Sequence, residues 1–272
     1  MMILLSQETG AKAGVTHPGW KSPRRVSRGP HGGVRMPLHV LPERMAGAAE
    51  NMAVDFLLLR RYPQTGHARF RAYGWHRPAF TFGYSQKIEA VRAALPEAEG
   101  PFELCRRATG GGLVDHRQDW TYALVLPRGH PVGEARAVES YRLVHASLAR
   151  ALARAGHAVE LKENCEPDAC ATDAPGICFR RAERFDVIHR ETGAKVAGAA
   201  QKRTKEGLLL QGSVWRPALG AVDTGRLAED FAAELAALLG LDATPCGWPD
   251  FDDDEVAALT EQYGSAEWNE QR

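Results

Sequence analysis

The stretch FELCRRATGGGLVDHRQDWTYALVL, residues 102–126, combines two apolar runs with three consecutive glycines between them. Short apolar and aromatic runs that are bounded by turn signals are typical of buried strands. The two runs therefore predict strands at Phe102–Arg107 and Trp120–Leu126. The glycines predict a loop that joins the first strand to the second.

This glycine-rich loop is the first candidate site. The triplet Gly110–Gly112 can adopt positive φ and let a ligand lie against bare backbone amides. Arg106 and Arg107 precede it and would supply charge to a phosphate, a carboxylate or an acidic partner. The pattern is neither a P-loop nor a Rossmann fingerprint, because Gly-Lys-Ser/Thr and the G-x-G-x-x-G spacing are both missing. The alternative is a plain turn between two strands.

Outward from this stretch, helical and strand patterns alternate unevenly. Helical spacing of apolar residues or period-2 alternation predicts the following elements: helices at Ala48–Tyr62, Ala135–Gly156 and Thr224–Leu239, short strands around a turn within Phe70–Tyr84, a hairpin of Arg184–His189 and Lys195–Gln201, and a strand at Leu208–Trp215. Uneven alternation favours an α+β fold over regular βαβ units. We expect a mixed, largely antiparallel β-sheet flanked by helices.

Composition excludes several classes of protein. With 34 basic and 34 acidic residues, the chain has no global positive field that would indicate nucleic acid. The apolar start, Met1–Leu5, is shorter than the roughly 7–15 residues of a secretory core and the about 20 of a membrane span. Five cysteines, an odd number without the spacing of a disulfide framework, favour a reducing compartment. We predict a cytoplasmic protein without nucleic-acid or membrane partners.

The first 35 residues differ in composition from the rest. Residues 1–35 are rich in Gly, Pro, Ser, Lys and Arg and lack apolar periodicity, which predicts a disordered leader. The basic run Lys21–Arg28 leaves an anchoring arm as one alternative, and translation from Met36 is another. Residues 36–272 are predicted to form a single domain.

Two further side chains could carry chemistry. Lys195 begins a strand of small residues, where its amine can lie beside a backbone that a ligand approaches closely; the alternative is a surface lysine in a hairpin. Cys178 would be a nucleophile if a nearby cation lowered its pKa, whereas a buried thiol that only packs is the alternative. Cys165, Cys170 and Cys178 lack the paired spacing of a structural zinc site, so no metal is predicted.

Several motifs occur together and in order, as in a known superfamily. The chain resembles the biotin/lipoate protein ligase superfamily over about residues 36–270. The motifs that carry the resemblance are Asn51-Met-Ala-Val-Asp55, Trp75-His-Arg-Pro78, Phe82-Gly83-Tyr84-Ser-Gln86, Arg106-Arg-Ala-Thr-Gly-Gly-Gly112 followed by Val114, His116 and Trp120-Thr-Tyr122, then Lys195-Val-Ala-Gly-Ala-Ala-Gln-Lys-Arg203 and Tyr263-Gly-Ser-Ala-Glu-Trp268-Asn. Each motif is weak alone, and the ordered set is specific.

The resemblance implies a catalytic domain with a mixed sheet, an acyl tunnel and a lysine at its mouth. Residues 36–272 would then be one acyltransferase or ligase domain. Cys178-Phe179 and Asp186 resemble the C-F-x6-[ED] segment of cysteine-dependent octanoyltransferases. The implied catalytic residues are Cys178 and Lys195. The implied acyl- and substrate-binding residues are Trp75, Gly83, Arg106, Arg107, Thr109, Gly110, Gly111, Gly112, His116, Gly198, Ala199 and Gln201.

The implied reaction is transfer of an octanoyl or lipoyl group to one lysine of a partner protein. The donor would be octanoyl-acyl carrier protein, and the acceptor a lipoyl domain of a 2-oxoacid dehydrogenase or the glycine-cleavage H protein. This reaction needs no cofactor. An ATP-dependent lipoate or octanoate ligase, which would need ATP and Mg, is the first alternative, and a non-catalytic acyl- or lipoyl-domain-binding protein is the second.

Four departures from the family pattern bear on these alternatives. Gln211 stands where many members have His, and Asp115 occupies an apolar slot before His116. The hairpin before Lys195 is slightly longer than usual. Gly112 stands where transferases often have another residue, which favours a ligase.

Overall fold

The large β-sheet contains nine strands. The computed structural model of the chain describes residues 37–60, 67–96, 100–164 and 181–271, all within one compact unit of residues 34–272. The strands of this sheet are β1 (Pro37–Val40), β2 (Arg44–Ala46), β3 (Ala68–Trp75), β7 (Asp119–Pro127), β8 (Val159–Leu161), β9 (Val187–His189), β10 (Lys195–Arg203), β11 (Gly207–Trp215) and β12 (Asp242–Pro245). Their order is β12-β1-β3-β7-β11-β10-β9-β8, and β2 also pairs with β3.

The sheet is mixed and largely antiparallel, as predicted. β1 runs parallel to β3 and β12, and β2 runs parallel to β3. The pairs from β3 through β7, β11, β10 and β9 to β8 are antiparallel. The predicted fold class is therefore confirmed.

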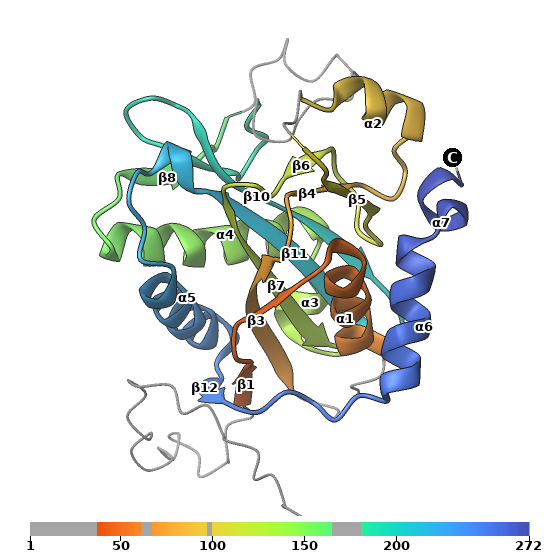
Figure 1. Cartoon of the computed structure of the whole chain (residues 1–272). Helices are drawn as coiled ribbons and strands as arrows, with labels where there is room; N and C mark the ends of the chain where they lie inside the picture. The colour runs from red at the N-terminus through yellow and green to blue at the C-terminus, as the bar shows by residue number, and fades with distance from the viewer. Residues whose placement is uncertain (1–36, 61–66, 97–99, 165–180, 272) are drawn as a thin grey trace, which may run out of the picture. The chain divides into compact units, whose positions relative to one another are not determined.

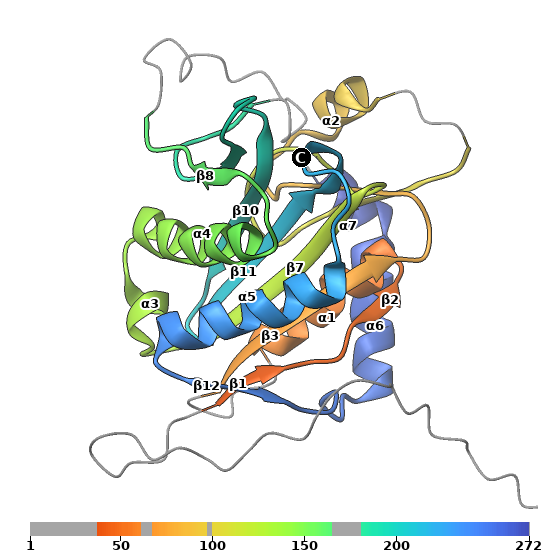
Figure 2. The same cartoon turned by 90° about the vertical axis from the view of Figure 1, so that its left-hand side faces the viewer.

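Helices cover both faces of the sheet (Figures 1 and 2). One face carries α4 (Ala137–Arg154) and α5 (Thr224–Leu239), and the other carries α1 (Ala48–Arg60) and α6 (Asp253–Gly264). Side chains alternate along β7, so Tyr122 and Leu124 join the core under α4 and α5, whereas Ala123 and Val125 join the core under α1. The central strands are therefore buried on both sides.

A second, three-stranded sheet holds the glycine-rich loop. Its strands are β4 (Ala79–Phe82), β5 (Glu103–Arg106) and β6 (Val114–Asp115), in the order β5-β4-β6, with α2 (Ile88–Ala94) packed on its apolar core. The loop of residues 107–113 joins β5 to β6, and β6 leads directly into β7. The loop is thereby fixed between the small sheet and the large one. The remaining short helices are α3 (Pro131–Glu134), η2 (Arg216–Ala218) and α7 (Ala266–Glu270).

Most of the predicted elements are present. The predicted hairpin is confirmed, with Lys195 opposite Ile188 and a turn closed by Gly193 at φ 68°. The two strands predicted within Phe70–Tyr84 exist, but they belong to different sheets. The predicted helix 135–156 is present as α4, which begins two residues later than predicted because Arg136 (ψ 145°) is not helical.

Other elements had no sequence prediction. They are β1, β2, β6, β8, β12, α2, α3, η2, α6 and α7. The predicted leader lies outside the described residues. In the described part of the chain, no helix is both long and apolar enough to cross a membrane.

Candidate active site

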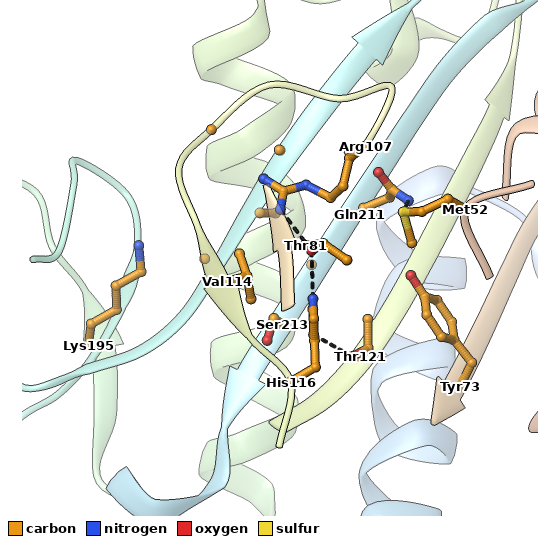
Figure 3. Close-up of a pocket in the computed structure, with 15 residues that line it drawn as sticks. Met52, Tyr73, Thr81, Arg107, Val114, His116, Thr121, Lys195, Gln211 and Ser213 are labelled. Atoms are coloured by element: carbon orange, nitrogen blue, oxygen red, sulfur yellow. Dashed lines mark hydrogen bonds between the residues drawn. The ribbon is translucent and has the colours of Figure 1, made fainter. Parts of the chain in front are cut away.

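One pocket lies between the two sheets (Figure 3). The small sheet and its loop provide one wall, and β3, β7, β10 and β11 provide the other, with Met52 from α1 at one end. Figure 3 shows Lys195 on one side of the pocket and Met52, Tyr73 and Gln211 on the opposite side. The lining residues are Met52, Tyr73, Thr81, Arg107, Gly111, Val114, His116, Thr121, Lys195, Gly198, Ala199, Ala200, Gln211, Gly212 and Ser213.

Arg107 fixes the glycine-rich loop from inside. Its guanidinium donates to the carbonyls of Gly110 (2.8 Å) and Gly112 (3.0 Å) and to the hydroxyl of Thr81 (2.8 Å). Gly111, between the two held carbonyls, has φ +87°, a conformation that favours glycine. Gly83 must also be glycine, because a Cβ there would lie 1.9 Å from the Gly111 oxygen. The predicted loop is therefore a rigid pocket wall, and Gly83 acts as its support rather than as part of the lining.

Thr109 connects the loop to the opposite wall. Its hydroxyl donates to Gln211 Oε1 at 2.7 Å, and Gln211 Nε2 donates to Asp55 Oδ2 at 2.7 Å. Asp55 also accepts from Arg71 Nε (2.6 Å) and from the Tyr73 hydroxyl (3.0 Å). Gln211, which departs from the family pattern, thus bridges the loop and α1 with both ends of its amide in use.

His116 lies at the centre of a second hydrogen-bonded chain. Its Nδ1 is 2.7 Å from Asp119 Oδ2, and its Nε2 is 2.6 Å from the Thr81 hydroxyl. Because the Asp119 carboxylate can only accept, Nδ1 donates to it, and in the neutral imidazole Nε2 then accepts from the Thr81 hydroxyl. Trp75 stacks on the imidazole with ring centroids 4.1 Å apart. The sequence motif contained His116 and Trp75, but it did not reveal Asp119 or Thr81.

Lys195 provides the cation on the other side of the pocket. Its Nζ lies 2.7 Å from Asp186 Oδ2, and the exposed fractions of the two side chains are only 7% and 0%. Gly198 leaves room for this side chain, because a Cβ there would lie 2.7 Å from Lys195 Cε. Ala199 follows on the pocket wall, and its N–H donates to the hydroxyl of Tyr141. An ammonium held beside an apolar cavity can stabilise negative charge that develops on a bound carbonyl oxygen.

Seven predicted binding residues are not part of the pocket lining: Trp75, Gly83, Arg106, Thr109, Gly110, Gly112 and Gln201. Five of them contact lining residues directly, whereas Arg106 and Gln201 have other roles. Arg106 is fully buried and donates to the carbonyls of Tyr84, Gln86, Trp268 and Asn269, so it holds α7 against β5 instead of charging a ligand site. Gln201 donates to the carbonyl of Ala137 and so contacts the start of α4. The period-2 alternation of a strand, which sends neighbouring side chains to opposite faces, could have separated Arg106 from Arg107.

Residues 47–216 match the family model described as the lipoyl protein ligase A/B catalytic domain. The chain belongs to this family. It is 28% identical over 185 residues to octanoyltransferase LipM of Macrococcus caseolyticus, covering 66% of this chain and 65% of the relative. It is 34% identical over 168 residues to octanoyltransferase LipM of Carboxydothermus hydrogenoformans, covering 61% and 60%. The matches thus span less than two thirds of the length of these relatives.

Solved structures share the fold at low sequence identity. A bi-partite lipoate protein ligase of Thermoplasma acidophilum superposes with a TM-score of 0.66 at 15% identity, covering 87% of this chain and 96% of that one. A lipoate-protein ligase A bound with ATP has a TM-score of 0.65 at 16% identity, covering 86% and 98%. These likenesses agree with the predicted fold class.

The predicted nucleophile, Cys178, lies outside the described residues, as do Cys165 and Cys170. Of the cysteines that the structure describes, Cys105 is buried, and burial raises the pKa of its thiol to about 12. Burial also raises the pKa of Cys246. Neither thiol lines the pocket. Across residues 37–60, 67–96, 100–164 and 181–271, no three His, Cys, Asp or Glu side chains are grouped to hold a metal ion.

Proposed function

We propose that this chain transfers an octanoyl group from acyl carrier protein to a specific lysine of a partner protein in the cytoplasm. The observation that carries the proposal is the Lys195 ammonium, which lines the pocket and is held 2.7 Å from Asp186. A fixed cation beside an apolar cavity suits a reaction in which an acyl carbonyl gains negative charge. The octanoyltransferases among the chain's relatives support an octanoyl group as the cargo.

In the proposed first step, Cys178 acts as the nucleophile. Its thiolate attacks the thioester carbonyl carbon of the donor, and a new S–C bond forms. The bond from that carbon to the sulfur of the carrier breaks, and the carrier leaves as a thiolate that takes a proton from solvent. Lys195 donates a hydrogen bond to the oxyanion of the tetrahedral intermediate, and backbone amides at Gly110–Gly112 add further donors.

In the proposed second step, the acceptor lysine amine attacks the acyl carbon of the Cys178 thioester. An N–C bond forms, the S–C bond breaks, and the proton released from the nitrogen passes to solvent. The Cys178 thiolate is thereby regenerated. No ATP is needed, because an amide is more stable than the thioester from which it forms. The proposed acceptors are lipoyl domains of 2-oxoacid dehydrogenases and the glycine-cleavage H protein.

The test is a transfer assay with purified components. The protein is incubated with octanoyl-acyl carrier protein and a lipoyl domain, with and without ATP and Mg²⁺, and mass spectrometry follows the lipoyl domain. We expect octanoylation without ATP. A lipoyl domain in which the acceptor lysine is replaced by arginine is the control, and it should stay unmodified.

The other outcomes contradict the proposal in distinguishable ways. Strict dependence on ATP and free octanoate or lipoate would make the chain a ligase, in which Lys195 contacts the acyl carbonyl and the α-phosphate. Gly112 favours that reading among the sequence features. No modification under either condition, together with binding of the lipoyl domain, would identify a non-catalytic binding protein.

A further inference from the structure

Tyr141 and His145 lie one turn apart on the same face of α4. Neither residue belongs to the family motifs described above. Their rings are neighbours, with centroids 4.1 Å apart. Both side chains contact the turn that precedes β9, the turn that carries Asp186. We propose that Tyr141 is a positioning residue for acyl transfer, which aims the Lys195 ammonium at the pocket by holding Asp186. This inference rests on the proposed function of Lys195.

The Tyr141 hydroxyl has a partner on each side. It donates to Asp186 Oδ1 and accepts from the backbone N–H of Ala199 at 3.1 Å. Ala199 lies beyond Ala197, the position where β10 pairs with Val187 of β9. The tyrosine hydroxyl therefore takes the place of a ladder partner at this edge of β10. One phenol thus fixes the carboxylate of Asp186 relative to the strand that carries Lys195.

The side chain of His145 binds the backbone of the same turn. Its Nδ1 is 2.7 Å from the carbonyl oxygen of Phe185, which can only accept, so Nδ1 carries the proton. Burial lowers the pKa of His145 to about 4, so the ring is neutral at physiological pH. Phe185 has φ 68°, a left-handed conformation that costs a residue with a side chain free energy. The contact with His145 helps this turn to keep that conformation.

Asp186 receives its donors in a fixed arrangement. Oδ1 accepts from Tyr141, and Oδ2 accepts from the N–H of Glu183 (2.6 Å) and from Lys195 (2.7 Å). These three donors prevent the carboxylate from rotating, so the position of its oxygens relative to Lys195 is fixed. The lysine stem has four rotatable carbons, and Asp186 is the anchor that selects one direction for its ammonium. Tyr141 therefore acts on the acyl carbonyl through two intermediate side chains.

Burial of the phenol agrees with this role. Burial, followed by the negative charge of Asp186, raises the pKa of Tyr141 well above its usual value. The side chain therefore stays a phenol that can donate to Asp186 throughout the working range of pH. Removing only this hydroxyl would leave the ring packing of α4 intact.

The test compares the wild-type protein with Tyr141→Phe in the ATP-free transfer assay. Loss of one hydrogen bond to a charged group should lower kcat about 10- to 100-fold, with KM for the octanoyl donor unchanged. Ser147→Ala is the matched control, because it also removes a buried hydroxyl of α4, and its bonds to Leu143 and Arg150 stay within that helix. The control should keep wild-type kcat. Wild-type kcat in Tyr141→Phe would overturn the inference.

A double-mutant cycle separates positioning from general loss of structure. If Tyr141 acts through Asp186, Tyr141→Phe combined with Asp186→Asn should be no slower than Asp186→Asn alone. Multiplicative effects of the two substitutions would mean that Tyr141 acts by another route, and the inference would be wrong.

His145 gives a second, independent check if Tyr141→Phe folds poorly. His145→Asn keeps an N–H that can reach the Phe185 carbonyl, whereas His145→Leu does not. The Asn variant should therefore be faster than the Leu variant. If both variants react at the wild-type rate, the turn that carries Asp186 does not need His145, and the positioning role is refuted. The proposed function and the positioning role can fail separately. If the wild-type protein transfers the octanoyl group and Lys195→Ala does not, but the Tyr141 and His145 variants keep wild-type rates, only the positioning role is wrong.

Discussion

Two buried ion pairs lie on opposite sides of the same pocket, and they have different surroundings. Arg71 and Asp55 are 2.6 Å apart, with side chains 1% and 0% exposed. Lys195 and Asp186 are 2.7 Å apart, with side chains 7% and 0% exposed. Distance and burial are thus nearly the same. By these measures alone, both pairs would be taken as structural or both as functional.

The difference lies in where the donors of each cation point. The Arg71 guanidinium donates to Asp55 and to the backbone and side chain of Asn51, and its Cζ lies 3.9 Å from the centroid of the Tyr73 ring. All of these contacts belong to the interface between β3 and α1. Lys195, in contrast, is part of the pocket lining. Orientation toward a cavity, rather than burial, separates a pair that holds the fold from a pair that can act on a ligand.

The largest expected effect comes from Cys178, the proposed nucleophile that would act together with Lys195. Cys178→Ala should lower transfer on the order of 10⁴-fold or more, because the nucleophile is lost. In the wild-type protein, a nearby cation should lower the pKa of the Cys178 thiol below the usual ~8.5. Iodoacetamide should therefore modify Cys178 faster than Cys105, whose pKa is about 12, and faster than Cys165, Cys170 and Cys246. Mass spectrometry should find the octanoyl thioester on Cys178. Full activity in Cys178→Ala would exclude the thioester route.

The second prediction concerns the Arg71 pair. Arg71→Ala leaves the Asp55 carboxylate buried without its charged partner, which should lower the free energy of unfolding by about 3–5 kcal/mol. Urea denaturation measures this loss. Arg92→Ala is the control, because its pair with Glu270 is exposed, and it should change stability by about 1 kcal/mol or less. Equal stability of the two variants would mean that burial does not distinguish these pairs.

The third prediction concerns Lys195 itself. Lys195→Ala should lower the transfer rate on the order of 10²–10³-fold, the usual effect of one oxyanion donor. Lys195→Arg should not restore the rate, since a planar guanidinium cannot occupy the position of a point charge. Initial rates with saturating octanoyl-carrier protein measure both. Near-normal turnover in Lys195→Ala would contradict the transferase and the ligase mechanism together.

The smallest expected effect on stability concerns the glycine-rich loop, which contains neither ion pair. Gly111→Val requires a side chain at φ +87°, at a cost of about 1–2 kcal/mol, which corresponds to a fall in Tm of about 2–8 °C. Its Cβ would also lie 3.3 Å from Arg107 Nη2, inside the pocket wall, so transfer should be lost. Gly129→Val is the control, with φ +83° and open space around its Cβ. It should show a similar shift in Tm with full activity, and complete unfolding of Gly111→Val would make the loop a structural turn.

Local patterns predicted what neighbouring residues determine. The strand patterns at Arg184–His189 and Lys195–Gln201 predicted the hairpin in which Lys195 lies opposite Ile188. The glycine triplet predicted a loop, and Thr224–Leu239 predicted α5 with the same bounds. In each case, periodicity or turn chemistry within about 20 residues was sufficient.

Contacts between distant segments could not be predicted in the same way. Thr81 comes from β4, 35 residues before its partner His116, and no spacing in the sequence relates the two. Tyr141 belonged to an amphipathic helical pattern, which predicts core packing and contains no information about a hydroxyl partner 45 residues later. Such pairs depend on how the sheets and helices pack. Residue type alone therefore predicted the candidate Lys195 but not the side chains that aim it.

The bonds of Arg106 have a consequence for the synthesis of the protein. This arginine, next to the residue that fixes the glycine-rich loop, has partners at Trp268 and Asn269, 162 and 163 residues later in the chain. At about 5–20 residues per second, roughly 8–30 s pass between the translation of the arginine and that of its partners. During this time β5, which leads into the glycine-rich loop, lacks its hydrogen bonds to the C-terminal segment. A nascent chain therefore carries every motif of the loop well before it can hold the finished pocket.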